Sequence, residues 1–380
     1  MIPRGFQLAG ARCGLKNRRN DVGLIVSDRP AAAAGVFTTN LVHAACVDVS
    51  REATSRGTLR AIAVNSGNAN CCTGEQGLRD SRRMATLAGN ALGVSAEEVA
   101  VASTGVIGHL MDMVKLEKGI ELASQALGDD PRPFMEAILT TDLVEKSAYA
   151  EVGVARIFGM GKGSGMIAPR LATMLAFVVT DLVVSPDRLQ QALERAASHT
   201  FNCLTVDGDS STNDMLLVLA NGASEVEPSD AQLDEALGSV CLSLTRQIAR
   251  DGEGATKLLE IQVTSSSDPA RIARTIAESP LVKTAMFGCD PNWGRIMAAA
   301  GRAGVPFDPN EARLAVLSGG EEYLLFEDGT PASFDARRVS TALKSDVVRI
   351  ELTLGPGASA TFYTCDFGYG YVRINAEYHT

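Results

Sequence analysis

The sequence predicts a mixed α/β fold in which layered sheets are flanked by helices. Short apolar segments of strand length alternate with a few longer amphipathic segments. No motif repeats with a period of about 20 to 50 residues, which argues against a solenoid or propeller. No apolar run reaches the roughly 18 residues of a membrane helix. With 380 residues, of which 46% are hydrophobic, the chain can bury a large core.

Strands are expected where apolar and β-branched residues stand together over strand lengths. These segments are residues 22–26, 61–64, 99–102, 175–184, 215–220, 258–263, 347–354, 360–365 and 371–375. The segment 175–184 opens with a continuous apolar run, residues 175–179, which is typical of a strand buried on both faces.

Three segments have the periodicity of amphipathic helices, namely residues 77–92, 186–199 and 230–249. In the second, Ser185 is a suitable N-cap and Pro186 suits the first helical position. Because such helices alternate with strands along the chain, the mixed class follows.

Composition and charge favour a small-molecule substrate. The formal net charge is −10 and no long basic stripe is present, which argues against a nucleic-acid or anionic-membrane partner. The first residues lack a basic segment followed by an apolar one, so we expect no secretory signal and a cytoplasmic location. The eight cysteines include no Cys-x-x-Cys spacing, so we expect reduced thiols and no metal site.

The glycine-rich segment 159–165 precedes an Ala172-Thr173 peptide and the expected central strand. We interpret it as a bend that can hold this peptide under strain. If the Thr173 hydroxyl cuts the Ala172–Thr173 bond, the new chain begins with a residue that carries a nucleophile and, in its α-amine, a base. The similar Ala85-Thr86 peptide lies in a predicted helix with no glycine turn before it, so we expect no cleavage there.

The commoner meanings of a glycine cluster fit this segment less well. A phosphate loop would need glycine at Arg156 and serine or threonine at Gly163. A dinucleotide fingerprint would need glycine or alanine at Ser164 or Met166. A purely structural bend stays open as the alternative.

Residues 101–108 provide the Thr104 hydroxyl and backbone N–H groups at an expected glycine turn after a strand. This composition suits an oxyanion hole, and the alternative is an ordinary turn. Residues 207–214 lack the spacing of a calcium loop and are expected as a tight polar turn near the active site. Trp293 is expected to serve packing. The four histidines form no Ser-His-Asp arrangement, and His109 is the one nearest the oxyanion segment.

Six blocks in order together resemble the ornithine acetyltransferase family of arginine biosynthesis. They are residues 65–70, 103–108, 162–175, 251–255, 288–294 and 371–375. The resemblance runs nearly from end to end. It implies a self-cleaving enzyme with an N-terminal threonine nucleophile. The implied α chain is residues 1–172 and the β chain residues 173–380; we expect the two to share one core and to assemble as an α2β2 heterotetramer.

The resemblance also implies the reaction and its residues. Acetyl moves from N-acetylornithine to glutamate through acetyl-Thr173, with no cofactor or metal, and whether acetyl-CoA also serves as donor stays open. Thr104 and Gly105 are implied to hold the oxyanion. The implied substrate-binding residues are Thr140, Lys162, Thr173, Glu253, Asn375 and Thr380.

Two departures from the family pattern stand out. Leu143 stands where a threonine is expected after Thr140-Thr141-Asp142, and Arg170-Leu171 stands before the scissile peptide where Asn-Met is common. An N-terminal nucleophile hydrolase or aminopeptidase on a related fold is the alternative function. An uncleaved binding protein on the same scaffold is a third.

Overall fold

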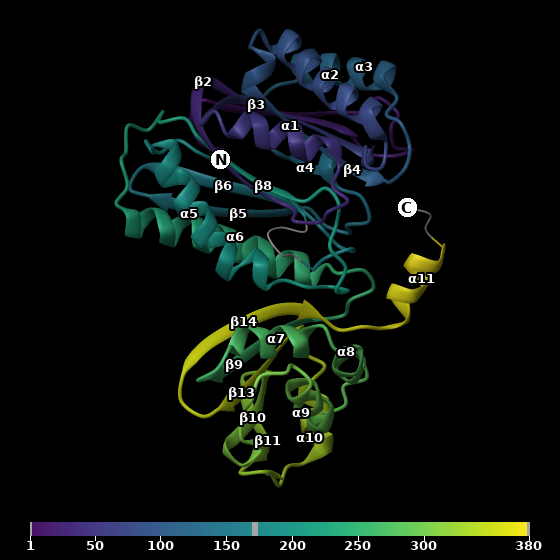
Figure 1. Ribbon diagram of the computed structural model, residues 1–380, viewed down its shortest axis with the longest axis vertical. Coiled ribbons are helices and arrows are strands. Elements are labelled where there is room, and N and C mark those ends of the chain that lie inside the picture. The colour runs from purple at the N-terminus through teal and green to yellow at the C-terminus, as the bar shows by residue number, and fades with distance from the viewer. Residues whose placement is uncertain (1, 169–173, 378–380) are drawn as a thin grey trace.

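The computed structural model describes residues 2–168 and 174–377, and it has two lobes (Figure 1). The larger lobe is built on an eight-stranded sheet and the smaller lobe on a six-stranded sheet. The chain enters the smaller lobe after helix α6 and leaves it through strand β14, so that the last helix, α11, lies back beside the larger lobe (Figure 1).

The large sheet has the strand order β4-β3-β2-β8-β7-β6-β5, and β1 pairs with β2. Its strands are β1 (Phe6–Ala11), β2 (Val22–Phe37), β3 (Thr58–Asn68), β4 (Val99–Val106), β5 (Lys146–Val152), β6 (Ala155–Lys162), β7 (Leu175–Thr180) and β8 (Met215–Ala220). The helices of this lobe are α1 (Ala45–Thr54), α2 (Gly74–Leu92), α3 (Met113–Gln125), α4 (Arg132–Ile138), α5 (Pro186–His199) and α6 (Asp230–Arg250). Segments on both sides of the Ala172–Thr173 peptide therefore contribute strands to one sheet.

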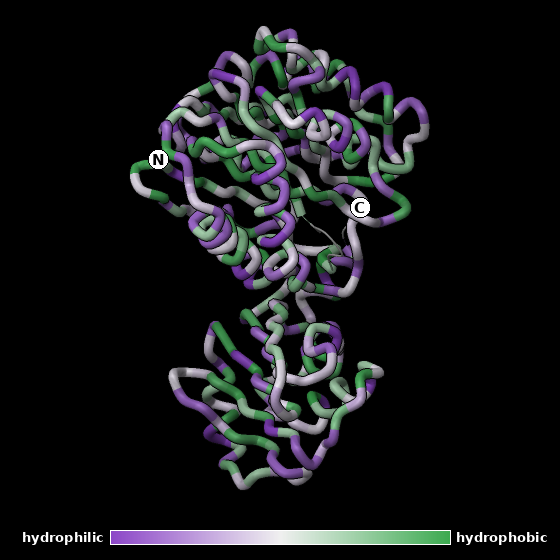
Figure 2. Tube along the Cα trace, turned by 60° about the vertical axis from the view of Figure 1, so that its left-hand side comes forward, coloured by the Kyte–Doolittle hydropathy of each residue, from purple (hydrophilic) through white to green (hydrophobic). Residues whose placement is uncertain are grey.

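Every residue of strands β7 and β8 is buried. Because successive side chains of a strand point to opposite sides, both faces of these two strands are covered. Phe177 and Leu217 pack into one core, where the ring of Phe134 on α4 meets that of Phe177 edge-on at 5.6 Å between centroids. Val178 and Val218 pack into a second core, beneath α5 and α6. Figure 2 shows hydrophobic segments running through the interior of both lobes, with hydrophilic ones on the outer helices.

The glycines at 159 and 161 lie inside β6, which corrects the expected bend at this point. A Cβ atom on Gly159 would come within 2.5 Å of Val240 Cγ1 and 3.1 Å of Leu244 Cδ1, both on α6. Glycine at 159 therefore lets the helix pack closely on the strand. The chain leaves the strand only after Lys162.

The small sheet has the order β12-β11-β10-β13-β9-β14. Its strands are β9 (Leu258–Ser265), β10 (Ala312–Ser318), β11 (Glu321–Glu327), β12 (Thr330–Pro331), β13 (Val347–Leu354) and β14 (Ala358–Cys365), and its helices are α7 (Pro269–Ala277), α8 (Pro280–Phe287), α9 (Trp293–Gly301) and α10 (Ala336–Ala342). These helices share a third hydrophobic core with the sheet. The packing role expected for Trp293 is confirmed, because its ring stacks on that of Phe326 at 5.3 Å.

The predicted bounds 186–199, 215–220 and 347–354 are confirmed, and most other predicted elements are present with longer or shifted ends. The predicted strand at 371–375 is wrong, because these residues belong to helix α11 (Tyr369–Glu377). Short apolar runs of this kind do not distinguish strand from helix without a partner. Within the described residues, no helix is long and apolar enough to cross a membrane.

Candidate active site

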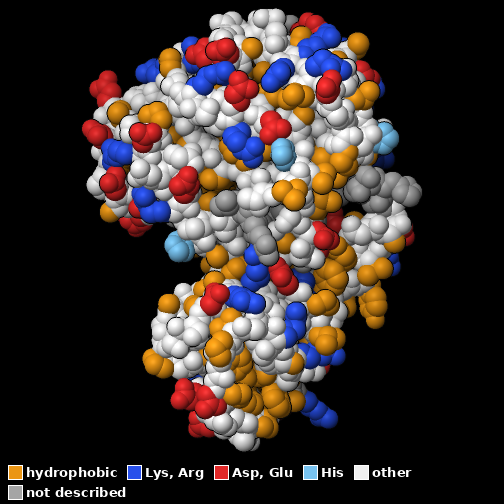
Figure 3. Space-filling model, viewed as in Figure 1, with side chains coloured by type: hydrophobic (Ala, Val, Ile, Leu, Met, Phe, Trp, Pro, Cys, Tyr) orange, Lys and Arg blue, Asp and Glu red, His pale blue; other side chains and the backbone are white. Residues whose placement is uncertain are grey.

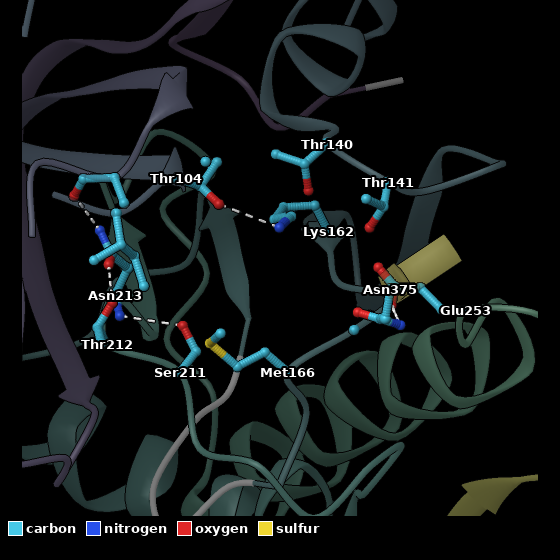
Figure 4. Close-up of a pocket in the computed structure, with 14 residues that line it drawn as sticks. Thr104, Thr140, Thr141, Lys162, Met166, Ser211, Thr212, Asn213, Glu253 and Asn375 are labelled. Atoms are coloured by element: carbon cyan, nitrogen blue, oxygen red, sulfur yellow. Dashed lines mark hydrogen bonds between the residues drawn. The ribbon is translucent and has the colours of Figure 1, made fainter. Parts of the chain in front are cut away.

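A pocket lies in the larger lobe where the ends of several strands meet helix α11 (Figure 4). It is lined by Ala69, Thr104, Gly105, Ile107, Thr140, Thr141, Lys162, Gly165, Met166, Ser211, Thr212, Asn213, Glu253 and Asn375. All six described candidates for the oxyanion hole and for substrate binding are in this set. Ala172, Thr173 and Thr380 lie outside the described residues.

Sheet topology brings these distant segments together. Strand β6 is antiparallel to β7, so Lys162, the last residue of β6, pairs with Leu175, the first of β7. Strand β7 is parallel to β8, so Leu175 also pairs with Met215. The end of β6 and the starts of β7 and β8 therefore share one edge of the sheet, and Met174, which directly follows Thr173 in the chain, accepts a hydrogen bond at its carbonyl from Met215 N at 3.0 Å.

Thr104 and Gly105 lie in the last residues of β4, not in a turn, which corrects that detail of the sequence interpretation. The φ angle of Gly105 is +132°, in a region that favours glycine. A Cβ atom there would lie 2.4 Å from the carbonyl carbon of Gly67 on β3 and 2.6 Å from Asn68 N. Glycine is thus required for the close approach of the two strands at the pocket.

Lys162 is half-buried, and its Nζ donates a hydrogen bond to Thr104 Oγ1 at 3.2 Å. Burial lowers the pKa of Lys162, while the carboxylates of Asp142, Asp214 and Glu253 oppose this shift. Its ammonium is therefore placed to meet an anionic group in the pocket.

Glu253 and Asn375 face each other on the other side of the pocket (Figure 4). Asn375 Nδ2, on α11, donates to Glu253 Oε2 at 2.8 Å. A Cβ atom on Gly165 would lie 2.4 Å from this carboxylate, so the glycine leaves room for it. Gly254, with φ at +71°, lets α11 approach, since a Cβ there would lie 2.3 Å from Tyr371 N.

Sequence reasoning missed the buried charges behind the pocket. The Nζ of Lys146 lies 2.7 Å from Asp142 Oδ1 and 2.6 Å from Asp251 Oδ2, and the Lys146 side chain is fully buried. Asp142 also accepts hydrogen bonds from Gly163 N at 2.7 Å and Thr140 N at 3.1 Å. Burial raises the pKa of Asp142, but the ammonium groups of Lys146 and Lys162 more than offset burial and hold this pKa well below its usual range.

The network is completed by the segment after α6. Asp251 Oδ2 accepts from Leu143 N at 3.1 Å, and the Asp251 carbonyl accepts from Ser164 Oγ at 2.7 Å. Three pocket segments, at 140–143, 162–164 and 251–253, are thereby tied to one buried ammonium. The i, i+4 spacing of Asp142 and Lys146 is the only signal in the sequence that could have indicated part of it.

The predicted polar turn at 207–214 lies beside the pocket and bonds to the segments that line it. Asp207 accepts hydrogen bonds from Met166 N at 2.7 Å and Ile167 N at 2.8 Å. Asn213 Nδ2 donates to the carbonyls of Ala69 at 2.6 Å and Ser103 at 2.8 Å. The turn thus connects the chain after β6 with the ends of β3 and β4.

Asp214, at the end of this turn, is buried and was also missed. Its Oδ2 has no hydrogen-bond partner among the parts of the chain that the structure describes. Burial raises the pKa of Asp214 well above its usual range, against the Ser211 hydroxyl and the ammonium of Lys162, which lower it. A buried carboxyl in this state is costly to ionise.

Other candidates lie away from the pocket. His109 is exposed and is not among the lining residues. Across residues 2–168 and 174–377, no group of three or more His, Cys, Asp or Glu side chains is arranged to hold a metal ion. The described side chains that line the pocket offer hydroxyl, amine, amide and carboxylate groups.

Comparison with known proteins identifies the family of this chain. Residues 7–380 match the ArgJ family. The arginine biosynthesis bifunctional protein ArgJ of a Synechococcus species is 48% identical over 404 residues, covering 100% of this chain and 96% of the relative. The protein of the same name from Shouchella clausii is 46% identical, covering 99% of this chain and 95% of the relative.

A solved structure is also similar. The crystal structure of the arginine biosynthesis bifunctional protein ArgJ from Bacillus halodurans matches with a TM-score of 0.51 and 40% identity, over 53% of this chain and 98% of that chain. The family match spans nearly the whole sequence, and the relatives cover it almost completely. The chain therefore belongs to the ArgJ family.

Proposed function

We propose that this chain is a glutamate N-acetyltransferase of arginine biosynthesis, which transfers acetyl from N-acetylornithine to glutamate through an acetyl group on Thr173. The observation that carries the proposal is that one pocket collects Thr104, Gly105, Thr140, Lys162, Glu253 and Asn375 from distant parts of the chain. Family membership supports the same activity.

The charges of the pocket suit amino-acid substrates. N-acetylornithine carries a carboxylate and a side-chain ammonium, and glutamate carries carboxylates and an amine. The half-buried ammonium of Lys162 fits a carboxylate, and the carboxylate of Glu253 fits an ammonium group. The two lie in the same pocket, so one substrate can contact both.

The chemistry follows from a threonine that carries its own base. In the first half-reaction Thr173 Oγ attacks the acetyl carbonyl carbon, its proton passes to the α-amine, and the bond to nitrogen breaks as ornithine takes that proton. In the second, the amine of glutamate attacks the acetyl ester and the bond to Thr173 Oγ breaks. The proton lost by the glutamate nitrogen passes through the α-amine to the Thr173 oxygen. The carbonyl oxygen is negative in each tetrahedral intermediate and needs donors.

Self-cleavage between Ala172 and Thr173 is part of the proposal. The solved chain from Bacillus halodurans corresponds to about half of this sequence, as expected for one chain of a cleaved precursor. Strand β7 pairs with β6 across the cut, which would keep the two chains together. We include an α2β2 assembly in the proposal on the resemblance alone, and a cytoplasmic location because the relatives are named as proteins of arginine biosynthesis.

A second acetyl donor is favoured by the names of the relatives. Those proteins are called bifunctional. Acetyl-CoA is the donor whose use would give the enzyme a second reaction, because glutamate could then be acetylated without N-acetylornithine. Mass measurement of the β chain after incubation with acetyl-CoA alone tests this directly, and a β chain that gains no acetyl group would contradict it.

The cleavage and the nucleophile are tested by intact mass of the purified protein before and after brief incubation with N-acetylornithine. We expect a β chain that begins at Thr173 and gains one acetyl group. Thr173→Ala should leave a single band near the full 39.9 kDa. Thr86→Ala, which changes the similar Ala-Thr peptide on α2, is the matched control and should be cleaved normally.

The hydrolase alternative is tested by the fate of the acetyl group. A transferase should form N-acetylglutamate in proportion to the glutamate supplied. Release of free acetate from N-acetylornithine at the same rate with and without glutamate would overturn the transferase assignment.

A further inference from the structure

The contact between Lys162 and Thr104 joins two roles that the family resemblance keeps separate. Lys162 Nζ lies 3.2 Å from Thr104 Oγ1, although the residues are 58 positions apart (Figure 4). Thr104 is buried at the end of β4, and Lys162 is the last residue of β6. A residue implied to bind substrate therefore touches a residue implied to hold the oxyanion.

The direction of this hydrogen bond is fixed by chemistry. An ammonium has three donors and no acceptor, so Thr104 Oγ1 must be the acceptor. A hydroxyl has one proton and two lone pairs. Because Lys162 occupies a lone pair, the Thr104 proton stays free to be donated to another oxygen in the pocket.

The acidic residues near Lys162 are bonded to other donors. Asp142 accepts from Lys146 and Gly163, each at 2.7 Å, and Glu253 accepts from Asn375 at 2.8 Å. Over the described ranges, Thr104 Oγ1 is the hydrogen-bond partner found for Lys162, and no carboxylate lies within ion-pair distance of its Nζ. A donor that is itself bonded to a cation is a stronger donor, since hydrogen bonds in a chain polarise one another.

We propose that Lys162 is a positioning residue of the oxyanion hole, which orients and polarises the Thr104 hydroxyl toward the reacting carbonyl oxygen. The inference rests on the proposed function. When Thr173 Oγ attacks the acetyl carbon, the carbonyl electron pair moves to oxygen, and Thr104 donates its hydrogen bond there. No proton leaves Lys162 or Thr104. The effect applies to every acetyl donor, whether or not the donor carries a carboxylate.

The test uses p-nitrophenyl acetate, which has neither carboxylate nor ammonium, with the purified, cleaved enzyme. The rate of the nitrophenolate burst is measured for wild type, Lys162→Met, Thr104→Val and the double variant, each normalised to its content of β chain beginning at Thr173. We expect Thr104→Val to slow acetylation by about 100-fold or more and Lys162→Met by about tenfold. The double variant should be no slower than Thr104→Val, because Lys162 acts through Thr104.

Two control variants keep the test decisive. Lys16→Met removes another positive charge near the site. The Nζ of Lys16 donates to the Leu139 carbonyl at 2.8 Å, and Lys16 does not line the pocket. This variant should leave the burst rate unchanged. Lys162→Gln keeps a neutral hydrogen-bond donor, so its burst rate is expected to fall between those of wild type and Lys162→Met. If Lys162→Met does not mature, Lys162→Gln takes its place in the comparison.

The outcomes separate this inference from the proposed function. A Lys162→Met burst equal to wild type, together with a raised KM for N-acetylornithine, would show that Lys162 only binds carboxylate and would overturn the inference alone. Independent effects of the two substitutions in the double variant would do the same. A wild-type enzyme that gains no acetyl group from N-acetylornithine would contradict the proposed function itself.

Discussion

The two sides of the pocket each contain a buried aspartate, and the two aspartates differ in their hydrogen-bond partners. On the side formed by residues 140–146 and 251–253, Asp142 is surrounded by donors, with the Lys146 ammonium at 2.7 Å. On the side where β8 begins, Asp214 is equally buried, yet its Oδ2 has no partner among the described residues. The ammonium groups near Asp142 lower its pKa, and burial raises that of Asp214.

Among the described residues, one side is thus a fully bonded scaffold, and the other holds a buried carboxyl oxygen for which no partner is found. A satisfied ion-pair network fixes the backbone around Thr140, Lys162 and Glu253, so its value is geometric precision at the pocket. An unsatisfied buried carboxyl lowers stability. Native proteins keep such groups chiefly where function needs them. Asp214 immediately precedes Met215, whose amide bonds to the residue that follows Thr173.

Breaking the satisfied side should have the largest effect. Lys146→Met leaves Asp142 and Asp251 as buried charges without their cation, so we expect a loss of about 3 to 5 kcal/mol in the free energy of unfolding, measured in urea. Lys257→Met is the matched control. Lys257 is similarly buried in the small lobe but donates to neutral carbonyls, of Met286 at 2.9 Å and Leu343 at 2.8 Å. Its loss should cost about 1 to 3 kcal/mol. Equal costs for the two variants would contradict the distinction between the two kinds of buried lysine.

Relieving the unsatisfied side should have a smaller effect of opposite sign. A carboxyl whose pKa is raised in the folded state ionises first in the unfolded chain, so its contribution lowers stability as pH rises above about 4 and until pH passes the raised pKa. The ammonium of Lys162, on β6, is the charged group that acts on the Asp214 carboxyl. The neighbouring contacts are neutral backbone ones: Met215 N donates to the Met174 carbonyl, and Thr38 N, just after β2, donates to the Asp214 carbonyl. Asp214→Asn should therefore gain about 1 to 3 kcal/mol at neutral pH and little at pH 4, followed by thermal melting.

The control for Asp214→Asn lies at the other end of β7. Asp181 is buried, and its carboxylate accepts from Arg156 N at 2.7 Å and Arg4 N at 3.0 Å. Because this aspartate is satisfied, Asp181→Asn should destabilise the protein at neutral pH. If Asp214→Asn also lost stability there, Asp214 would have to be satisfied in the folded protein after all.

The smallest effect is expected for exposed charges, which Figure 3 shows interspersed in both signs over the larger lobe. The pair between Arg83 on α2 and Glu117 on α3, 3.3 Å apart, is about half exposed. Arg83→Ala should cost less than about 1 kcal/mol. Molar salt should shrink this difference, while leaving that of Lys146→Met nearly unchanged. If Arg83→Ala lowered the free energy of unfolding as much as Lys146→Met, burial would not determine how much an ion pair contributes to stability.

Much of the local structure was predictable because it depends on neighbours in the chain. The start of α5 is marked by Ser185 at the N-cap position and Pro186 at the first helical position, and the bounds of β8 follow from an unbroken apolar run. The segment 371–375 failed because three apolar residues in five suit a strand or a helix equally. The bend expected at Gly159 was wrong because this glycine makes room for α6, which lies some 80 residues later in the chain.

The sequence by itself determined the family, the Ala-Thr peptide proposed as the cleavage site, and the six described residues that turn out to line one pocket. These rest on short motifs whose residues are adjacent in the chain. Only the tertiary structure decided that Lys162 contacts Thr104, that Lys146 joins Asp142 to Asp251, and that Asp214 is buried without a partner for one oxygen among the described residues. Each of these contacts depends on the register of strands that are distant in sequence. Each also depends on which hydrogen-bond partners lie within reach of a charged group once it is buried.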